Sequence, residues 1–117
     1  MTKDKGISAC AIIMMPNPEN IERGFKRLLN YALENKVTKL VIFLYAPWSY
    51  AEWIPSMREG ISQNLHITLI INSYSDKTLV IKNAERCEYS KLIVVTSGKS
   101  MKSIRIKHKN VEVLEIE

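Results

Sequence analysis

Short runs of consecutive apolar residues alternate with segments in which apolar residues recur every three or four positions. A nearly continuous apolar run at residues 7–15 is typical of a strand buried on both faces, and further strands are predicted at 39–45, 66–72 and 92–96. After each of the first three runs, apolar residues recur at the spacing of an amphipathic helix. Asn17 is predicted to cap the first helix, which ends at Asn35-Lys36, and Ser75-Asp76 is predicted to cap a helix that extends to about Tyr89.

This alternation predicts one α/β domain over residues 1–117, a Rossmann-like three-layer sandwich with a mainly parallel five-stranded sheet. The tail at residues 111–117 alternates apolar and acidic side chains, which predicts a half-buried or edge strand. Residues 100–110 fit two interpretations, a short helix or the first arm of a hairpin. A chain of 117 residues can bury a core of this kind without metal or disulfide support.

The segment after the second strand is rich in proline and aromatic residues. Pro47 and Pro55 bracket it, and because proline opens a helix more readily than it continues one, a helix is predicted only from residue 56 to 64. Met57, Ile61 and Leu65 have the spacing of its inward stripe.

Composition and cysteine usage favour an ordinary globular protein of the cytoplasm. Hydrophobic residues make up 46% of the chain and charged residues 25%, and the apolar runs are too short to cross a bilayer. No basic and apolar leader opens the sequence, so a cytoplasmic location is expected. Cys10 lies in an apolar strand and Cys87 near a helix end, and both are predicted to be buried, reduced thiols.

Candidate chemistry gathers at the carboxyl ends of the predicted strands, the edge at which open α/β sheets bind ligands. The fourth strand runs into Ser97-Gly98-Lys99-Ser100, which lacks the first glycine of the phosphate-binding pattern GxxxxGK[ST]. A simpler anion nest and a tight turn with an exposed lysine remain two interpretations of this loop.

Four aromatic residues crowd the second loop and its surroundings: Tyr45, Trp48, Tyr50 and Trp53. They are interpreted either as a stacking surface for a ligand or as a lid on the core. His66 and His108 have no evident nucleophilic partner, and an enzyme is not favoured.

The positive charge of the chain is concentrated near its end. The net charge is +5, and residues 99–109 hold five cations and no acid, namely Lys99, Lys102, Arg105, Lys107 and Lys109. Such a segment fits two interpretations, a lysine-rich face exposed to solvent, which the charge alone favours, and a surface that contacts nucleic-acid phosphates. In a hairpin, glutamates of the tail could neutralise these cations.

Three segments resemble the universal stress protein family. Residues 12–33 are similar to its first strand, loop and long helix, residues 88–97 to its fourth strand, and residues 111–116 to its closing strand. Nucleotide-binding members of the family carry G-x2-G-x9-G-[ST] after the fourth strand. In this sequence Thr96 stands at the first glycine, and Gly98 lies one position early for the second. The resemblance implies the fold, a stress-related role and a homodimer, with ATP or AMP as candidate ligands that lack the usual motif.

These observations lead to three hypotheses about function. The first is a non-enzymatic binding or regulatory domain that dimerises through its last strand, with Val111, Val113, Leu114 and Ile116 in the interface. The second is a nucleotide or other small anion at the sheet edge, with a base covered by Tyr45 or Trp48 and phosphate held by Asn17, Ser97, Gly98, Lys99 and Ser100. The third is nucleic-acid binding through the five cations of residues 99–109. No metal site is predicted.

Overall fold

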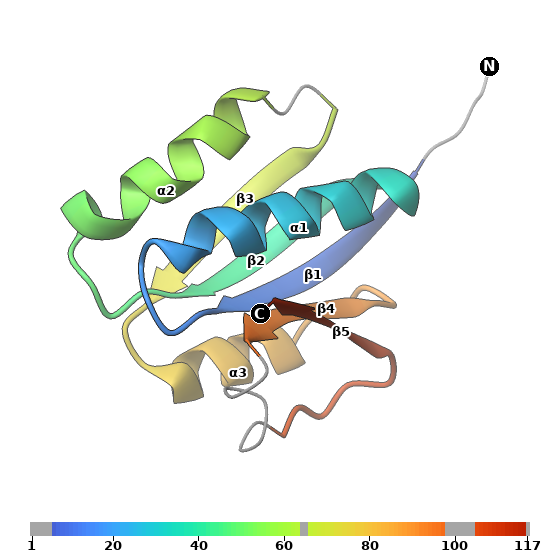
Figure 1. The fold of residues 1–117 in the computed structure, drawn as a ribbon. Coiled ribbons are helices and arrows are strands. Elements are labelled where there is room, and N and C mark those ends of the chain that lie inside the picture. Colours follow the sequence, from blue (N-terminus) through green and yellow to red (C-terminus); the bar gives the residue numbers. More distant parts are fainter. Residues whose placement is uncertain (1–5, 64–65, 98–104, 117) are drawn as a thin grey trace.

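A computed structural model shows a five-stranded parallel sheet with helices on both faces, and it describes residues 6–63, 66–97 and 105–116 (Figure 1). The strands follow the order β3-β2-β1-β4-β5, and every neighbouring pair is parallel. The elements in chain order are β1 (Ile7–Met14), α1 (Asn20–Glu34), β2 (Val37–Tyr45), α2 (Tyr50–Gln63), β3 (Thr68–Tyr74), α3 (Lys77–Glu85), β4 (Leu92–Ser97) and β5 (Val111–Ile116).

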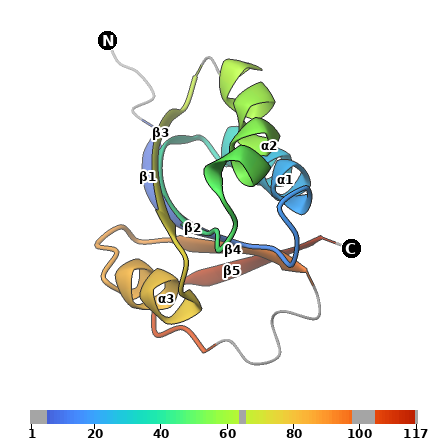
Figure 2. The same ribbon diagram turned by 90° about the vertical axis from the view of Figure 1, so that its left-hand side faces the viewer.

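The helices divide into two layers around the sheet. Figure 2 shows α1 and α2 on one face and α3 on the other. The predicted three-layer α/β sandwich with a five-stranded sheet is therefore confirmed. The strand order is that of the first five strands of the Rossmann arrangement. From β1 the chain adds β2 and β3 on one side of the sheet and then β4 and β5 on the other, so the order of strand addition reverses between β1 and β4.

The core lies on both faces of the central strands. Side chains of β1 alternate between the two faces, with Ile13 in the cluster under α1 and Ile12 in the cluster under α3. Phe25 of α1 is fully buried, and so is Val80 of α3. The continuous apolar runs of β1 and β4 exist because both of their faces are covered.

Helix α2 begins six residues before its predicted start, so the prediction of a helix from residue 56 is wrong. The Ser49 backbone N–H donates to a carboxylate oxygen of Glu52 at 2.9 Å, which is one half of a capping box. Pro55 therefore stands inside the helix and removes one backbone hydrogen bond, a cost of about 3 kcal/mol. Burial of Trp53 and Met57 offsets it, since a large apolar side chain contributes about 1.5–3 kcal/mol.

The predicted ends of α1 and α3 also differ from the structure. Asn17 does not cap α1; its carbonyl accepts the Asn20 N–H in a turn, and Glu19 holds the cap position. The cap of α3 is confirmed, because the Asp76 side chain accepts the Thr78 N–H at 2.8 Å. Helix α3 ends at Glu85, four residues before the predicted limit.

The connection from β4 to β5 is not a hairpin, because the two strands are parallel. Residues 105–110 form neither helix nor strand, whereas residues 98–104 lie outside the described part of the chain. Ile106 packs against the cluster under α3, and the Lys107 N–H donates to Glu85 at 2.8 Å. The crossover therefore returns along the face that α3 occupies.

The two cysteines are joined, which contradicts the prediction of reduced thiols. A disulfide links Cys10 in the middle of β1 to Cys87 just after α3, across 77 positions of the sequence. Both residues face the α3 side of the sheet, where α3 brings its end over β1. Nothing in their spacing along the chain indicates this proximity.

No helix among the described residues is long and apolar enough to span a membrane.

Candidate functional site

The carboxyl ends of β2 and β3 enclose an aromatic cavity. It measures about 250 Å³ and is lined by Ala46, Trp48, Tyr50, Trp53, Ser73, Tyr74 and Ser75. Strand β2 delivers the segment that carries Trp48, and α2 begins beside it with Tyr50 and Trp53. Because β2 and β3 are in register at Tyr45 and Tyr74, their following loops meet at one level of the sheet edge.

Side chains around this cavity combine flat apolar surfaces with a cation. The Tyr45 and Trp48 rings meet edge to face, with centroids 6.0 Å apart. The Lys77 ammonium at the start of α3 lies 5.3 Å from the Tyr45 ring centroid, a cation–π distance. The cavity itself presents aromatic faces and serine hydroxyls, which suit a planar ligand. Tyr45 and Lys77 lie outside its lining, and the contact of Tyr45 with Trp48 connects them to it.

Residues of the aromatic segment differ in how deeply they are buried. Trp53 is only 5% exposed and belongs to the core under α1 and α2, whereas Tyr50 is 69% exposed. Trp48 is half-buried and packs against the same core while it lines the cavity. The segment thus both closes the core and provides a surface at the sheet edge.

Two of the predicted phosphate contacts, Asn17 and Ser97, lie at the same edge, farther along the sheet. Asn17 is exposed in the loop after β1, and Ser97 is the half-buried last residue of β4. These two strands are parallel neighbours, and the order in which the chain adds strands to the sheet reverses between them. Gly98, Lys99 and Ser100 lie outside the described residues, and so does Lys102 of the basic segment.

The rest of the basic segment and the predicted dimer strand are described. Arg105, Lys107 and Lys109 are exposed on the irregular crossover. In β5, Leu114 and Ile116 are buried against the core under α1, whereas Val111 and Val113 remain 36% and 41% exposed.

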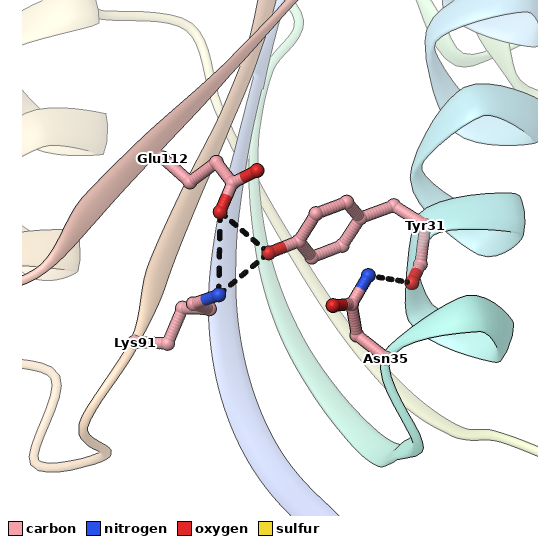
Figure 3. Close-up of polar contacts among 4 residues, drawn as sticks. All are labelled: Tyr31, Asn35, Lys91 and Glu112. Carbon is pink, nitrogen blue, oxygen red and sulfur yellow. Dashed lines mark hydrogen bonds and ion pairs between the residues drawn. The ribbon is translucent and has the colours of Figure 1, made fainter.

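A polar cluster at the opposite, amino edge of the sheet was not anticipated from the sequence (Figure 3). The Tyr31 hydroxyl of α1 donates to Glu112 of β5 at 2.7 Å and accepts from the Lys91 ammonium at 2.6 Å. Lys91 also pairs with Glu112 at 3.2 Å. The Asn35 side chain donates to the Tyr31 carbonyl at 2.8 Å and fastens the end of α1. These contacts span 60 and 81 positions of sequence, so no local pattern reveals them.

The pKa shifts in this cluster favour a structural role. Hydrogen bonds from Tyr31 and then Lys91 lower the pKa of the Glu112 carboxyl. The Tyr31 contact raises the pKa of Lys91, and burial raises the pKa of Tyr31 itself. Each group is thereby held more firmly in the state it already has at neutral pH, whereas general acid–base catalysis needs a pKa near that pH. The cluster ties α1 to β5.

Candidate metal ligands do not gather in the described part of the chain, which contains no group of three or more His, Cys, Asp or Glu residues that could hold an ion.

Comparisons with known proteins extend the fold assignment. No protein-family model matches the sequence, and no curated protein matches it. Among solved structures, the chain is similar to the crystal structure of a hypothetical protein from Sulfolobus tokodaii, with a TM-score of 0.73 and 18% sequence identity. The similarity covers 93% of this chain and 95% of that one. It shows a shared α/β fold, and the resemblance to universal stress proteins stays a prediction.

Proposed function

We propose that this protein is a non-enzymatic binding module whose subunits pair through β5. The observation that carries the proposal is the free edge of this strand. Among the described residues, β5 pairs with β4 alone, so its other edge carries backbone groups that no described strand pairs, and Val111 and Val113 are exposed beside it. An exposed edge with apolar side chains is suited to pair with a second copy of itself.

The charges of β5 are compatible with one antiparallel register. A two-fold axis at Val113 places Val113 opposite its own copy and Val111 opposite Glu115, on the same face of the joined sheet. Glu112 then lies opposite Leu114 on the other face. No glutamate faces another glutamate directly, so the like-charge penalty of a cross-strand pair is avoided. The result is a continuous sheet of two subunits.

The solution mass tests this arrangement. We expect twice the 13.5 kDa of one chain at tens of micromolar, measured by sedimentation equilibrium. Val113→Lys places two ammonium groups face to face at the axis and should give monomers. Ile70→Lys is the matched control, because Ile70 is equally exposed, at 42%, on the opposite edge strand β3. A monomeric wild type, or dimers of the Val113→Lys variant, would contradict the proposal.

The aromatic cavity favours a second function, binding of a nucleotide or another planar anion. Trp48 offers a face on which a base can stack, and such stacking contributes about 1–3 kcal/mol per base. Lys77 supplies positive charge beside Tyr45, and Asn17 and Ser97 lie along the same edge of the sheet. The ligand class is proposed on this combination of ring surface and cation.

Tryptophan fluorescence tests this second function. AMP, ATP and cyclic nucleotides should quench the emission of the wild type in a saturable manner. Trp48→Leu should weaken the binding at least about fivefold and leave Trp53 as an intact reporter of the fold, whereas Leu79→Ala, at an exposed position of α3, should bind like the wild type. Absence of a response to all of these nucleotides would remove the hypothesis.

A further inference from the structure

A second, larger cavity runs along the outer side of α2, above the edge strand β3. It measures about 390 Å³, which falls within the range of small-molecule sites. Its lining comes almost entirely from one face of α2 with two residues of β3: Tyr50, Trp53, Ile54, Met57, Arg58, Ile61, Ile71 and Ser73. We refer to it as the α2–β3 groove.

The groove exists because α2 leans toward α1 at the margin of the sheet. Gly60 faces the Phe25 ring of α1 so closely that a Cβ atom at this position would lie 2.6 Å from a ring carbon. This approach draws the inner side of α2 to α1. Within the part of the chain that the structure describes, β3 is the last strand on this side of the sheet, so the outer side of the helix overhangs the sheet edge. Figure 1 shows α2 beside α1 at this margin.

Because of the overhang, the groove has buried apolar side chains at its base and a solvent-exposed apolar side chain at one end. Trp53 and Met57 are 5% and 1% exposed and form the floor. Ile61, predicted from its spacing to point inward, is 44% exposed at one end of the groove. The prediction for Ile61 is therefore wrong, because its helical position faces the space beyond β3.

One charge stands beside this apolar surface. Arg58 is the single ionisable cation of the lining, and its side chain is exposed. In the described part of the chain, no hydrogen bond or ion pair involves its guanidinium. Ser73 contributes a hydroxyl from β3. The groove thus offers an apolar channel with a single unmatched positive charge.

We propose that the α2–β3 groove binds a small amphipathic monoanion, of the class of medium-chain carboxylates. The alkyl chain lies along Trp53, Met57 and Ile61, where it removes apolar surface from water. The carboxylate pairs with Arg58, whose planar guanidinium matches two carboxylate oxygens. A ligand with several charges does not fit, because the remaining lining would leave them without partners.

Calorimetric titration with octanoate and 1-octanol tests the proposal directly, at concentrations below those at which octanoate forms micelles. The two probes share the chain and differ in charge, so the wild type should bind octanoate at least tenfold more tightly. Arg58→Gln should weaken octanoate about tenfold and leave octanol unchanged. Arg23→Gln, an exposed arginine of α1, is the matched control and should bind both probes like the wild type.

A second variant tests the channel rather than the charge. Ile61→Glu changes an exposed position, so the fold should persist by circular dichroism, while a carboxylate inside the groove should abolish octanoate binding. No binding of octanoate to the wild type, equal affinity for the two probes, or undiminished binding by Ile61→Glu would each overturn the proposal. The oligomeric mass and the nucleotide response of these variants should equal those of the wild type, which separates this site from the proposed function.

Discussion

The disulfide between Cys10 and Cys87 should provide a large part of the stability of this domain. Reduction is the cleanest perturbation, because it breaks one bond and leaves every side chain in place. A double variant, Cys10→Ala/Cys87→Ala, provides the control that cannot form the bond. We expect the oxidised protein to be the more stable form, and the difference should disappear in the double variant.

The expected magnitude follows from the length of chain that the bond closes. The cysteines are 77 positions apart. In the chain-entropy description, closing a loop of this size lowers the conformational entropy of the unfolded state by about 15 cal/mol/K. This corresponds to about 4.5 kcal/mol at 25 °C. A chain of 117 residues has an unfolding entropy of about 250 cal/mol/K, so the midpoint of thermal unfolding should fall by about 18 °C on reduction.

Urea unfolding of oxidised and reduced protein, followed by the fluorescence of the buried Trp53, measures the difference. Reduction should be completed in the unfolded state, because Cys10 is only 3% exposed. Thiol titration of the untreated native protein should find no free cysteine. A loss of stability below about 1 kcal/mol, or two titratable thiols in the untreated protein, would refute the reasoning.

Three further substitutions probe single contacts by denaturation. Gly60→Ala should destabilise by about 1–2 kcal/mol, since overpacking against Phe25 exceeds the gain in helix propensity; an unchanged urea midpoint would contradict the close approach of the helices. Lys36→Gly should stabilise by about 0.5 kcal/mol, because Lys36 has a φ of 60°, and a lower melting temperature would contradict this. Glu112→Gln should destabilise at pH 7, and this deficit should vanish as the pH falls through the lowered pKa of Glu112, because the carboxylate that Tyr31 stabilises is then protonated. A deficit of constant size from pH 7 to pH 3, measured by urea unfolding, would refute the last prediction.

The sequence was sufficient to predict the architecture because buried parallel strands have a distinctive composition. The runs that became β1 and β4 are covered on both faces, and their apolar residues are therefore nearly continuous. The cap at Asp76 was also predictable, since its carboxylate acts on a backbone group two positions away. Each of these features depends on neighbours in the sequence.

Other features depend on contacts across the fold and could not be predicted in this way. The prediction for α2 weighed Pro55 against a helix and overlooked Ser49 and Glu52, whose capping pattern was the available signal. The disulfide and the cluster at Tyr31 join segments more than fifty positions apart. The sequence indicated a candidate ligand surface at Trp48. The α2–β3 groove arises because α2 leans toward α1, and the spacing of apolar residues in the sequence does not indicate how a helix is oriented on the sheet.

The disulfide also divides the molecule into two parts with respect to hydrogen exchange. The loop that it closes contains β1 from Cys10 onward, β2, β3 and the three helices of the described chain, whereas β4 and β5 follow it. The edge strand β5 can open locally, so its amides should exchange at a free energy below that of global unfolding. Reduction should accelerate exchange in β2 and leave β5 unaffected. A second subunit on β5 would therefore protect the strand that the covalent link does not reach.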